Sequence, residues 1–319
     1  MPTTEDAADG RQDRRLDAGA LRFAIVGKSR AVLYAAQWLE RLGATLVGVA
    51  SVEAARKLTP VPLAILIAAD RVTLPTAPAR APAQADGATE IRLWEYEVGR
   101  PGVGAFASAV SGVSTVIGAA DGPPGTMAAH VPEKWVGIYG ASLALSLQVC
   151  RLAKRSSVPR QIDICAADIL RAFAEQNSGN HAGVPYGWRR NGRTAVEHGG
   201  VFPQGFFACR DGYVAVQARS RQDWQGILAA LGNPAWSQAP EFQNPFKLSE
   251  DDSRIMPLLD GELRKLDRME ILERALACGA PMSPVLTSDE ARGANVFRPG
   301  FVLPSGEFSP PFVVRRNET

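Results

Sequence analysis

The chain has 319 residues, of which 46% are hydrophobic, and a formal net charge of +2 from 35 basic and 33 acidic side chains. A chain of this length can bury a substantial core in one large domain or two ordinary ones. Because the charges balance and form no block of one sign, composition gives no reason to expect nucleic acid as a partner. A small anionic ligand is compatible with it.

The cysteines and the N-terminal segment are typical of a cytoplasmic protein. The four cysteines lie far apart without a CxxC pair, which favours reduced thiols over a disulfide framework or a zinc site. Residues 1–20 are polar and charged and lack the apolar stretch of a signal peptide, so we expect a disordered tail there. No apolar run reaches the roughly 18 residues of a membrane span. We expect a soluble, cytoplasmic protein without a membrane partner.

The N-terminal half alternates between strand and helix patterns. Residues 21–27 and 44–50 are apolar runs typical of buried strands, and residues 31–43 between them have the periodicity of an amphipathic helix. A short helical stretch at 52–58 leads into a third apolar run at 63–69. Parallel strands need such crossovers, so the pattern predicts an α/β fold with helices on a parallel sheet.

The middle of the chain begins with a break in this pattern. Residues 71–90 are rich in Pro and Ala, which predicts a linker, and order is expected to resume near Ile91. Residues 104–125 predict a helix that breaks into a turn at 121–125. Residues 136–156 predict a long, mostly apolar helix, either deeply buried or in a subunit interface.

The second half mixes strands and helices. Residues 160–170 alternate and then become helical, 176–200 are loop-like, and 206–218 predict a β-hairpin around Asp211 and Gly212. Helix patterns follow at 220–232 and 256–279, and then a turn-rich stretch at 280–286. This half is typical of a smaller α+β domain.

The opening β-α-β unit raises the possibility of a nucleotide site. Its turn, GKSRAV, has one glycine where a dinucleotide fingerprint needs three, and no acidic residue ends the second strand. Both features argue against NAD or FAD. Lys28 and Arg30 either meet a phosphate near the helix N-terminus or are solvated loop charges.

Metal and serine chemistry have little support. The three histidines, at 130, 181 and 198, show no ligand spacing, so we expect no metal. Ser142 lies in GASLA, which lacks the second glycine of a GxSxG nucleophile motif.

Glu133 is the carboxylate that position singles out. It lies in AAHVPEKWVG, just before the long apolar helix, where a helix N-terminus and partial desolvation can set its reactivity. The alternative is a carboxylate that only complements the helix dipole.

Several segments, in the same order, resemble the family III CoA-transferases: FASAVSGVSTVIGAADGPPG, HVPEKWVGIYGASLALSLQ, RQIDICAADIL and FFACRDGYVAVQARSRQDWQGILAALG. The resemblance implies a Rossmann-like parallel-sheet domain, a smaller α+β domain and an interlocked dimer. We expect the large domain's first part at 21–190, the small domain at 191–290, and a segment returning to the large domain at 291–319.

The resemblance also implies a mechanism. In the family's transferases, an aspartate four residues before the glycine that opens the long helix attacks an acyl thioester, through acyl-anhydride and enzyme-CoA thioester intermediates. Here Glu133 stands four residues before Gly137. CoA or acyl-CoA would be the cosubstrate, with Lys28 or Arg30 near its phosphates. Gly199 and Gly200 would belong to a loop over the site, or to a turn before the hairpin.

Departures from the family pattern give a second hypothesis. Glutamate adds a methylene, the family's Ala-Gly-Pro turn is missing between Arg30 and Tyr34, and Val103 lies where the racemases carry a histidine. The alternative is a member that has lost CoA transfer. It would be either a non-catalytic subunit paired with a paralogue, or an enzyme using Glu133 as acid or base with help from His130. A third hypothesis, a nicotinamide oxidoreductase, rests only on the β-α-β opening.

Overall fold

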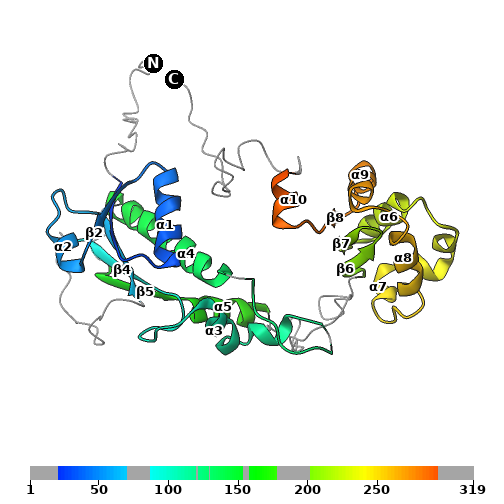
Figure 1. Cartoon of the computed structure of the whole chain (residues 1–319), viewed down its shortest axis with the longest axis horizontal. Helices are drawn as coiled ribbons and strands as arrows, with labels where there is room; N and C mark the ends of the chain where they lie inside the picture. The colour runs from blue at the N-terminus through cyan, green and yellow to red at the C-terminus, as the bar shows by residue number, and fades with distance from the viewer. Residues whose placement is uncertain are drawn as a thin grey trace, which may run out of the picture. The chain divides into compact units, whose positions relative to one another are not determined.

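The computed structural model describes residues 21–69, 87–119, 121–128, 130–153, 158–177 and 202–293. These residues fall into two compact units, each described by itself below (Figure 1). The first holds described residues of 21–114 and 126–174, and the second those of 115–125 and 175–293. The predicted tail and most of the predicted C-terminal segment lie outside the described residues.

The first unit contains a parallel five-stranded sheet in the order β2-β1-β3-β4-β5. Its strands are β1 (Arg22–Val26), β2 (Thr45–Val49), β3 (Ala64–Ala68), β4 (Thr89–Trp94) and β5 (Gln161–Cys165). Its helices are α1 (Arg30–Arg41), α2 (Val52–Arg56), α3 (Gly104–Val110), α4 (Val131–Leu152) and most of α5 (Ala166–Asn177). The 3₁₀ turn η3 (Val113–Val116) follows α3 and crosses into the second unit after Ser114.

The α/β prediction is confirmed. Because the central strands are buried, their sequences consist largely of apolar residues, which is why apolar runs predicted strands. Every residue of β3 and β4 is buried, as expected for central strands covered on both faces. Helix α1 ends at Arg41, two residues before the predicted glycine stop, Gly43, whose φ of 92° favours glycine. The N–H groups of Gly43 and Ala44 donate to the carbonyls of Glu40 and Leu39, which closes the helix end.

Three boundaries in this unit differ from the prediction. The predicted linker runs into β4, which begins at Thr89, and α3 ends at Val110 instead of continuing toward the turn. Helix α4 begins at Val131 and not at Val136. Pro132 does not stop it, because the first turn of a helix needs no N–H donor at that position.

Two glycines bring α4 close to its neighbours. A Cβ atom at Gly137 would lie 2.6 Å from the Ala31 carbonyl oxygen of α1, and one at Gly140 would lie 2.8 Å from Leu93 of β4. The face of α4 that carries these glycines is therefore buried, whereas Tyr139 and Val149 on the opposite side are exposed.

The second unit contains the antiparallel sheet β6-β7-β8 and a set of short helices. Its strands are β6 (Gln204–Cys209), β7 (Gly212–Gln217) and β8 (Met282–Pro284). Its helices are α6 (Arg221–Ala230), α7 (Pro245–Leu248), α8 (Met256–Leu263), α9 (Arg268–Cys278) and α10 (Ser288–Gly293), with the 3₁₀ turns η5 (Ala235–Gln238) and η6 (Pro240–Phe242).

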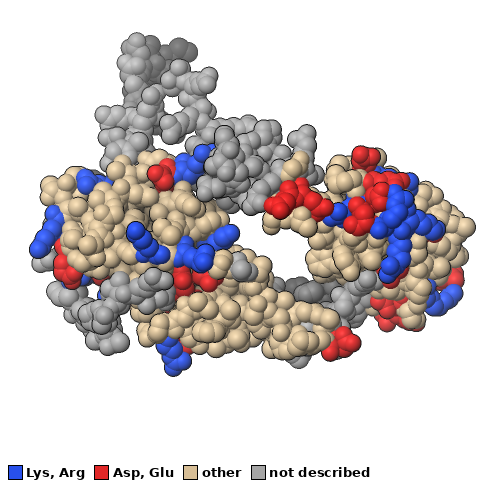
Figure 2. All heavy atoms as spheres, viewed as in Figure 1, with Lys and Arg blue, Asp and Glu red and all other residues tan. Residues whose placement is uncertain are grey.

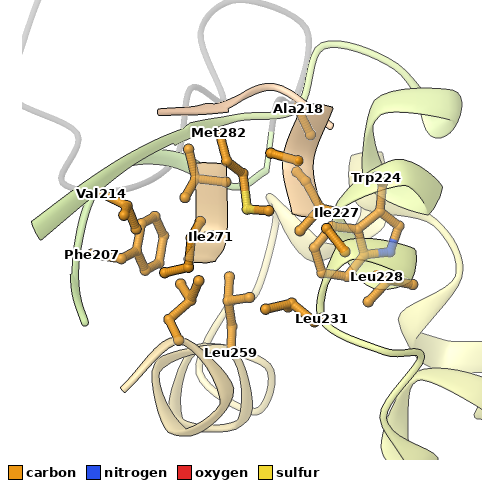
Figure 3. Packing of buried hydrophobic residues seen from close by; sticks show 14 of the residues in the cluster. Phe207, Val214, Ala218, Trp224, Ile227, Leu228, Leu231, Leu259, Ile271 and Met282 are labelled. Carbon is orange, nitrogen blue, oxygen red and sulfur yellow. The ribbon is translucent and has the colours of Figure 1, made fainter. Parts of the chain in front are cut away.

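Figure 3 shows the core of this unit, where Phe207, Ile227, Leu259 and Ile271 from the sheet and three helices converge. Trp224 is fully buried, and its indole N–H donates to the Phe242 carbonyl at 2.8 Å. This bond satisfies the only polar atom of the indole, so the large ring can lie in the core.

The predicted hairpin is confirmed as β6 and β7, and two other predictions are corrected. The stretch 256–279 forms two helices, α8 and α9, separated by residues 264–267. The turn-rich stretch 280–286 contains β8, which pairs with β7 over three residues. A strand this short shows no alternation in sequence, and only pairing with β7 defines it.

On the face drawn in Figure 2, acidic and basic side chains of the described residues appear on each unit, and on the second unit a group of basic side chains lies beside a group of acidic ones. Within the described ranges, no helix is both long enough and apolar enough to cross a bilayer.

Arg268 links three parts of the second unit. Its side chain, 17% exposed, donates to Asp211 in the β6–β7 turn, to the Val285 carbonyl after β8 and to Glu290 in α10. Hydrogen bonds from Arg268, and then from Thr287, lower the pKa of Glu290 to about 2.

Crowding at Gly137 predicts a stability loss. Gly137→Ala should destabilise the protein by about 1–3 kcal/mol, because the methyl group would force α4 away from α1. Denaturant unfolding measures this. Gly261→Ala in α8 is the control, since its added Cβ would meet nothing within 4 Å. Equal stability of the two variants would contradict the close packing.

The Arg268 network predicts an acid-dependent stability. The folded-state pKa of Glu290 is lowered, so its contribution is complete above the unfolded carboxyl value of about 4.3 and is lost as pH falls toward 2. Arg268→Met should remove this part of the pH dependence of the unfolding temperature. Arg274→Met, which breaks only an ion pair with Glu270 within α9, should leave it in place.

Candidate functional site

Glu133 lies in the first turn of α4, inside the helix and not before it. Its side chain is only 5% exposed. Oε1 accepts the backbone N–H of Gly104 at 2.9 Å, and Oε2 is buried without a hydrogen-bond partner among the described residues. A buried carboxylate oxygen without a donor is unusual, which marks Glu133 as a candidate functional group.

Gly104 begins α3 and lies directly against this carboxylate. A Cβ atom there would be 2.4 Å from Oε2 of Glu133 and 2.8 Å from Cβ of Pro132. The first N–H of a helix has no acceptor within the helix, and here the carboxylate supplies one. The starts of α3 and α4 are therefore joined through Glu133.

His130 immediately precedes α4 in a left-handed conformation, with φ of 66°. Its Nδ1 lies 4.0 Å from Oε1 of Glu133, and its side chain is 44% exposed. This separation is too long for a hydrogen bond but short enough for a charge interaction when the imidazole is protonated. The structure thus places the two predicted catalytic residues side by side.

Lys28 and Arg30 are both exposed at the start of α1. Two N–H groups at this helix start are already engaged: Ser29 accepts from Val32 at 3.3 Å, and Glu95 Oε1 accepts from Ala31 at 3.0 Å. The protein's own carboxylate thus occupies a donor that a phosphate would use, which argues further against a dinucleotide at this turn.

Sequence reasoning did not single out Gly104, Glu95 or Lys134. Lys134 follows Glu133 and lies with Nζ 5.6 Å from the centre of the Tyr34 ring on α1. Glu95 could have been found from its place directly after a buried strand. Gly104 gave no such signal, because its contact with Glu133 spans 29 residues.

The two predicted loop residues, Gly199 and Gly200, lie outside the described residues. Among the residues that the structure describes, no group of three or more His, Cys, Asp or Glu side chains is placed to hold a metal ion.

Comparison with known proteins agrees with this fold. The model of "CoA-transferase family III" matches residues 96–303, more than half of the chain. Comparison with curated proteins finds no sequence match.

Solved structures with a similar fold include two bacterial proteins. A CaiB/BaiF family protein from Brucella suis has a TM-score of 0.65 at 15% identity, covering 93% of this chain and 92% of its own. A hypothetical protein from Mycobacterium tuberculosis, Rv3272, has a TM-score of 0.66 at 18% identity, covering 87% and 86%. The chain belongs to CoA-transferase family III.

The backbone at His130 predicts an order of stabilities. A left-handed residue costs about 1–2 kcal/mol unless it is glycine. Both His130→Gly and His130→Ala remove the imidazole, so the difference between their free energies of unfolding reports the cost of the left-handed backbone conformation. Thermal unfolding should show the glycine variant more stable than the alanine variant by about 1 kcal/mol, and the reverse order would mean that His130 is not left-handed in solution.

Proposed function

We propose that the protein is a CoA-transferase-like enzyme that uses Glu133 as a carboxylate nucleophile and a CoA thioester as cosubstrate. The observation that supports this most directly is the pair of unequal oxygens on Glu133. Gly104 holds Oε1, whereas Oε2 has no donor among the described residues. An oxygen in that state retains its lone pairs for an incoming acyl carbon.

The proposed steps follow from this geometry. Oε2 attacks the thioester carbonyl, the C–S bond breaks, and CoA thiolate leaves with its electron pair, giving an acyl anhydride on Glu133. The thiolate then attacks the glutamyl carbonyl, which releases the first carboxylate and leaves an enzyme-CoA thioester. An acceptor carboxylate repeats the sequence in reverse.

Gly104 would assist the second step. When thiolate attacks the glutamyl carbonyl, negative charge develops on Oε1, the atom that already accepts the Gly104 N–H at 2.9 Å. A fixed donor aimed at a developing charge lowers the barrier without reorganisation. Lys28 and Arg30, both exposed, are the proposed contacts for CoA phosphates, and His130 is the nearby acid or base.

The proposal includes the small-molecule and subunit partners expected of the family. The second substrate is a carboxylic acid, and the working form is a dimer, either of identical chains or with a paralogue. The exposed side chains of Tyr139 and Val149 on α4 support a subunit contact, since a helix that is apolar on all sides is normally buried.

A second candidate is a family member that no longer transfers CoA. The burial of Glu133 favours it, because a carboxylate that is 5% exposed and bonded to α3 also suits a purely structural role. The repurposed version, with Glu133 as acid or base, is favoured by His130 at 4.0 Å.

Trapping with hydroxylamine distinguishes these functions. Incubation with a panel of acyl-CoA thioesters and hydroxylamine should place a hydroxamate on Glu133, detectable by mass spectrometry. Glu133→Gln should abolish this and lower transfer on the order of a thousandfold or more. Asp168→Asn is the matched control, because Asp168 is an exposed carboxylate in the first turn of α5.

Two negative results together would reject the transferase proposal. If no thioester labels Glu133 and calorimetry detects no CoA binding, the transferase proposal fails. Turnover of another substrate that depends on both Glu133 and His130 would then support the acid-base enzyme, and co-purification with an aspartate-bearing paralogue would support the non-catalytic subunit.

A further inference from the structure

The contact between Gly104 and Glu133 constrains both residues at once. The Gly104 N–H reaches Oε1 at 2.9 Å, and the position of its missing Cβ lies 2.4 Å from Oε2 and 2.7 Å from Cδ of Glu133. The carboxylate thus fills the space that a side chain at residue 104 would need.

The length of glutamate is what brings the carboxylate to this place. An aspartate at the same backbone position would end one carbon–carbon bond, about 1.5 Å, short of it. A donor–acceptor distance of 2.9 Å would then grow beyond hydrogen-bonding range, and an empty space would open against Gly104.

The absence of a side chain at 104 is what leaves room for glutamate. Gly104 lies in helix α3, and its φ is not in the left-handed range, so the backbone alone would accept alanine. In a helix, alanine is normally better than glycine. The atoms nearest to such a Cβ, all closer than 3.0 Å, belong to the Glu133 carboxylate and to Pro132.

We propose that Gly104 is a positioning residue that fits this site to a glutamate, so that glutamate 133 is a matched feature of the site and not a defect in an aspartate site. Gly104 has two effects on the carboxylate. Its N–H group holds Oε1 by a hydrogen bond, and the absence of a side chain leaves the space that Oε2 occupies. The catalytic part of this inference rests on the proposed function, whereas the fit between the two residues does not.

The test is a double-mutant cycle of Gly104→Ala and Glu133→Asp, read by unfolding and by acyl-CoA labelling of residue 133. Each single change should lower the labelling rate, about a hundredfold for a displacement near 1 Å. The aspartate vacates the part of the methyl's space that the Glu133 carboxylate fills, so the two losses should not multiply, although Pro132 Cβ, 2.8 Å from the methyl position, still crowds it. The double variant should label within about tenfold of Glu133→Asp and unfold at a higher temperature than Gly104→Ala.

A split of kinetic constants separates positioning from general damage. Gly104 touches the carboxylate, so Gly104→Ala should lower the maximal labelling rate while the acyl-CoA concentration for half-maximal labelling stays within about twofold. A parallel rise in that concentration would contradict a role confined to the carboxylate.

Gly137→Ala is the matched control for crowding, because it adds a methyl group to α4, the helix that carries Glu133. Its Cβ would meet the Ala31 carbonyl oxygen at 2.6 Å, so its defect should not be relieved by Glu133→Asp. Gly261→Ala, with open space around it, should change neither readout.

A further comparison holds even if Gly104→Ala fails to fold. Glutamine keeps the length of glutamate, so Glu133→Gln should unfold at a higher temperature than Glu133→Asp; the opposite order would overturn the fit. The fit would also be overturned if the effects of the two substitutions were independent, with labelling-rate losses that multiply and stability losses that add. A wild-type protein that never labels would end the proposed function, while the unfolding cycle would still decide the fit.

Discussion

The hydrogen bond between the Gly104 N–H and Oε1 of Glu133 joins the starts of α3 and α4, and the candidate site depends on it. It satisfies an N–H that α3 cannot satisfy itself, and it fixes one oxygen of a carboxylate that α4 carries into the interior. The same contact leaves the other oxygen without a donor among the described residues. The Glu133 side chain thus both links α3 to α4 and carries the oxygen proposed to react.

The spacing along α4 explains why this carboxylate faces inward. Glu133, Gly137 and Gly140 are four and then three residues apart, so they lie on one face of the helix. The two glycines press that face against α1 and β4, which brings Glu133 inside with them. The four-residue interval between the carboxylate and the glycine, read from sequence as a family motif, is therefore a requirement of packing as well.

Family membership and fold do not by themselves fix the reaction. The similar solved structures share the fold at 15% and 18% identity, and folds host different chemistries. The binding of CoA and the reactivity of Glu133 depend on local contacts, among them the occupied donors at the start of α1 and the contact between Glu133 and Gly104.

The α/β class, helix α1 with its glycine stop, the hairpin of β6 and β7, and the family could all be predicted from the sequence, because these depend on local periodicity, turn chemistry and the order of motifs. It also brought His130 and Glu133 together, since they are neighbours in the chain. It did not reveal β8 or the contact of Gly104 with Glu133, because both depend on residues far apart in the chain, whose contacts leave no local pattern. The start of α4 at Val131 and the break between α8 and α9 were also missed, although Pro132 in the first turn and Asp267 before α9 are local signals.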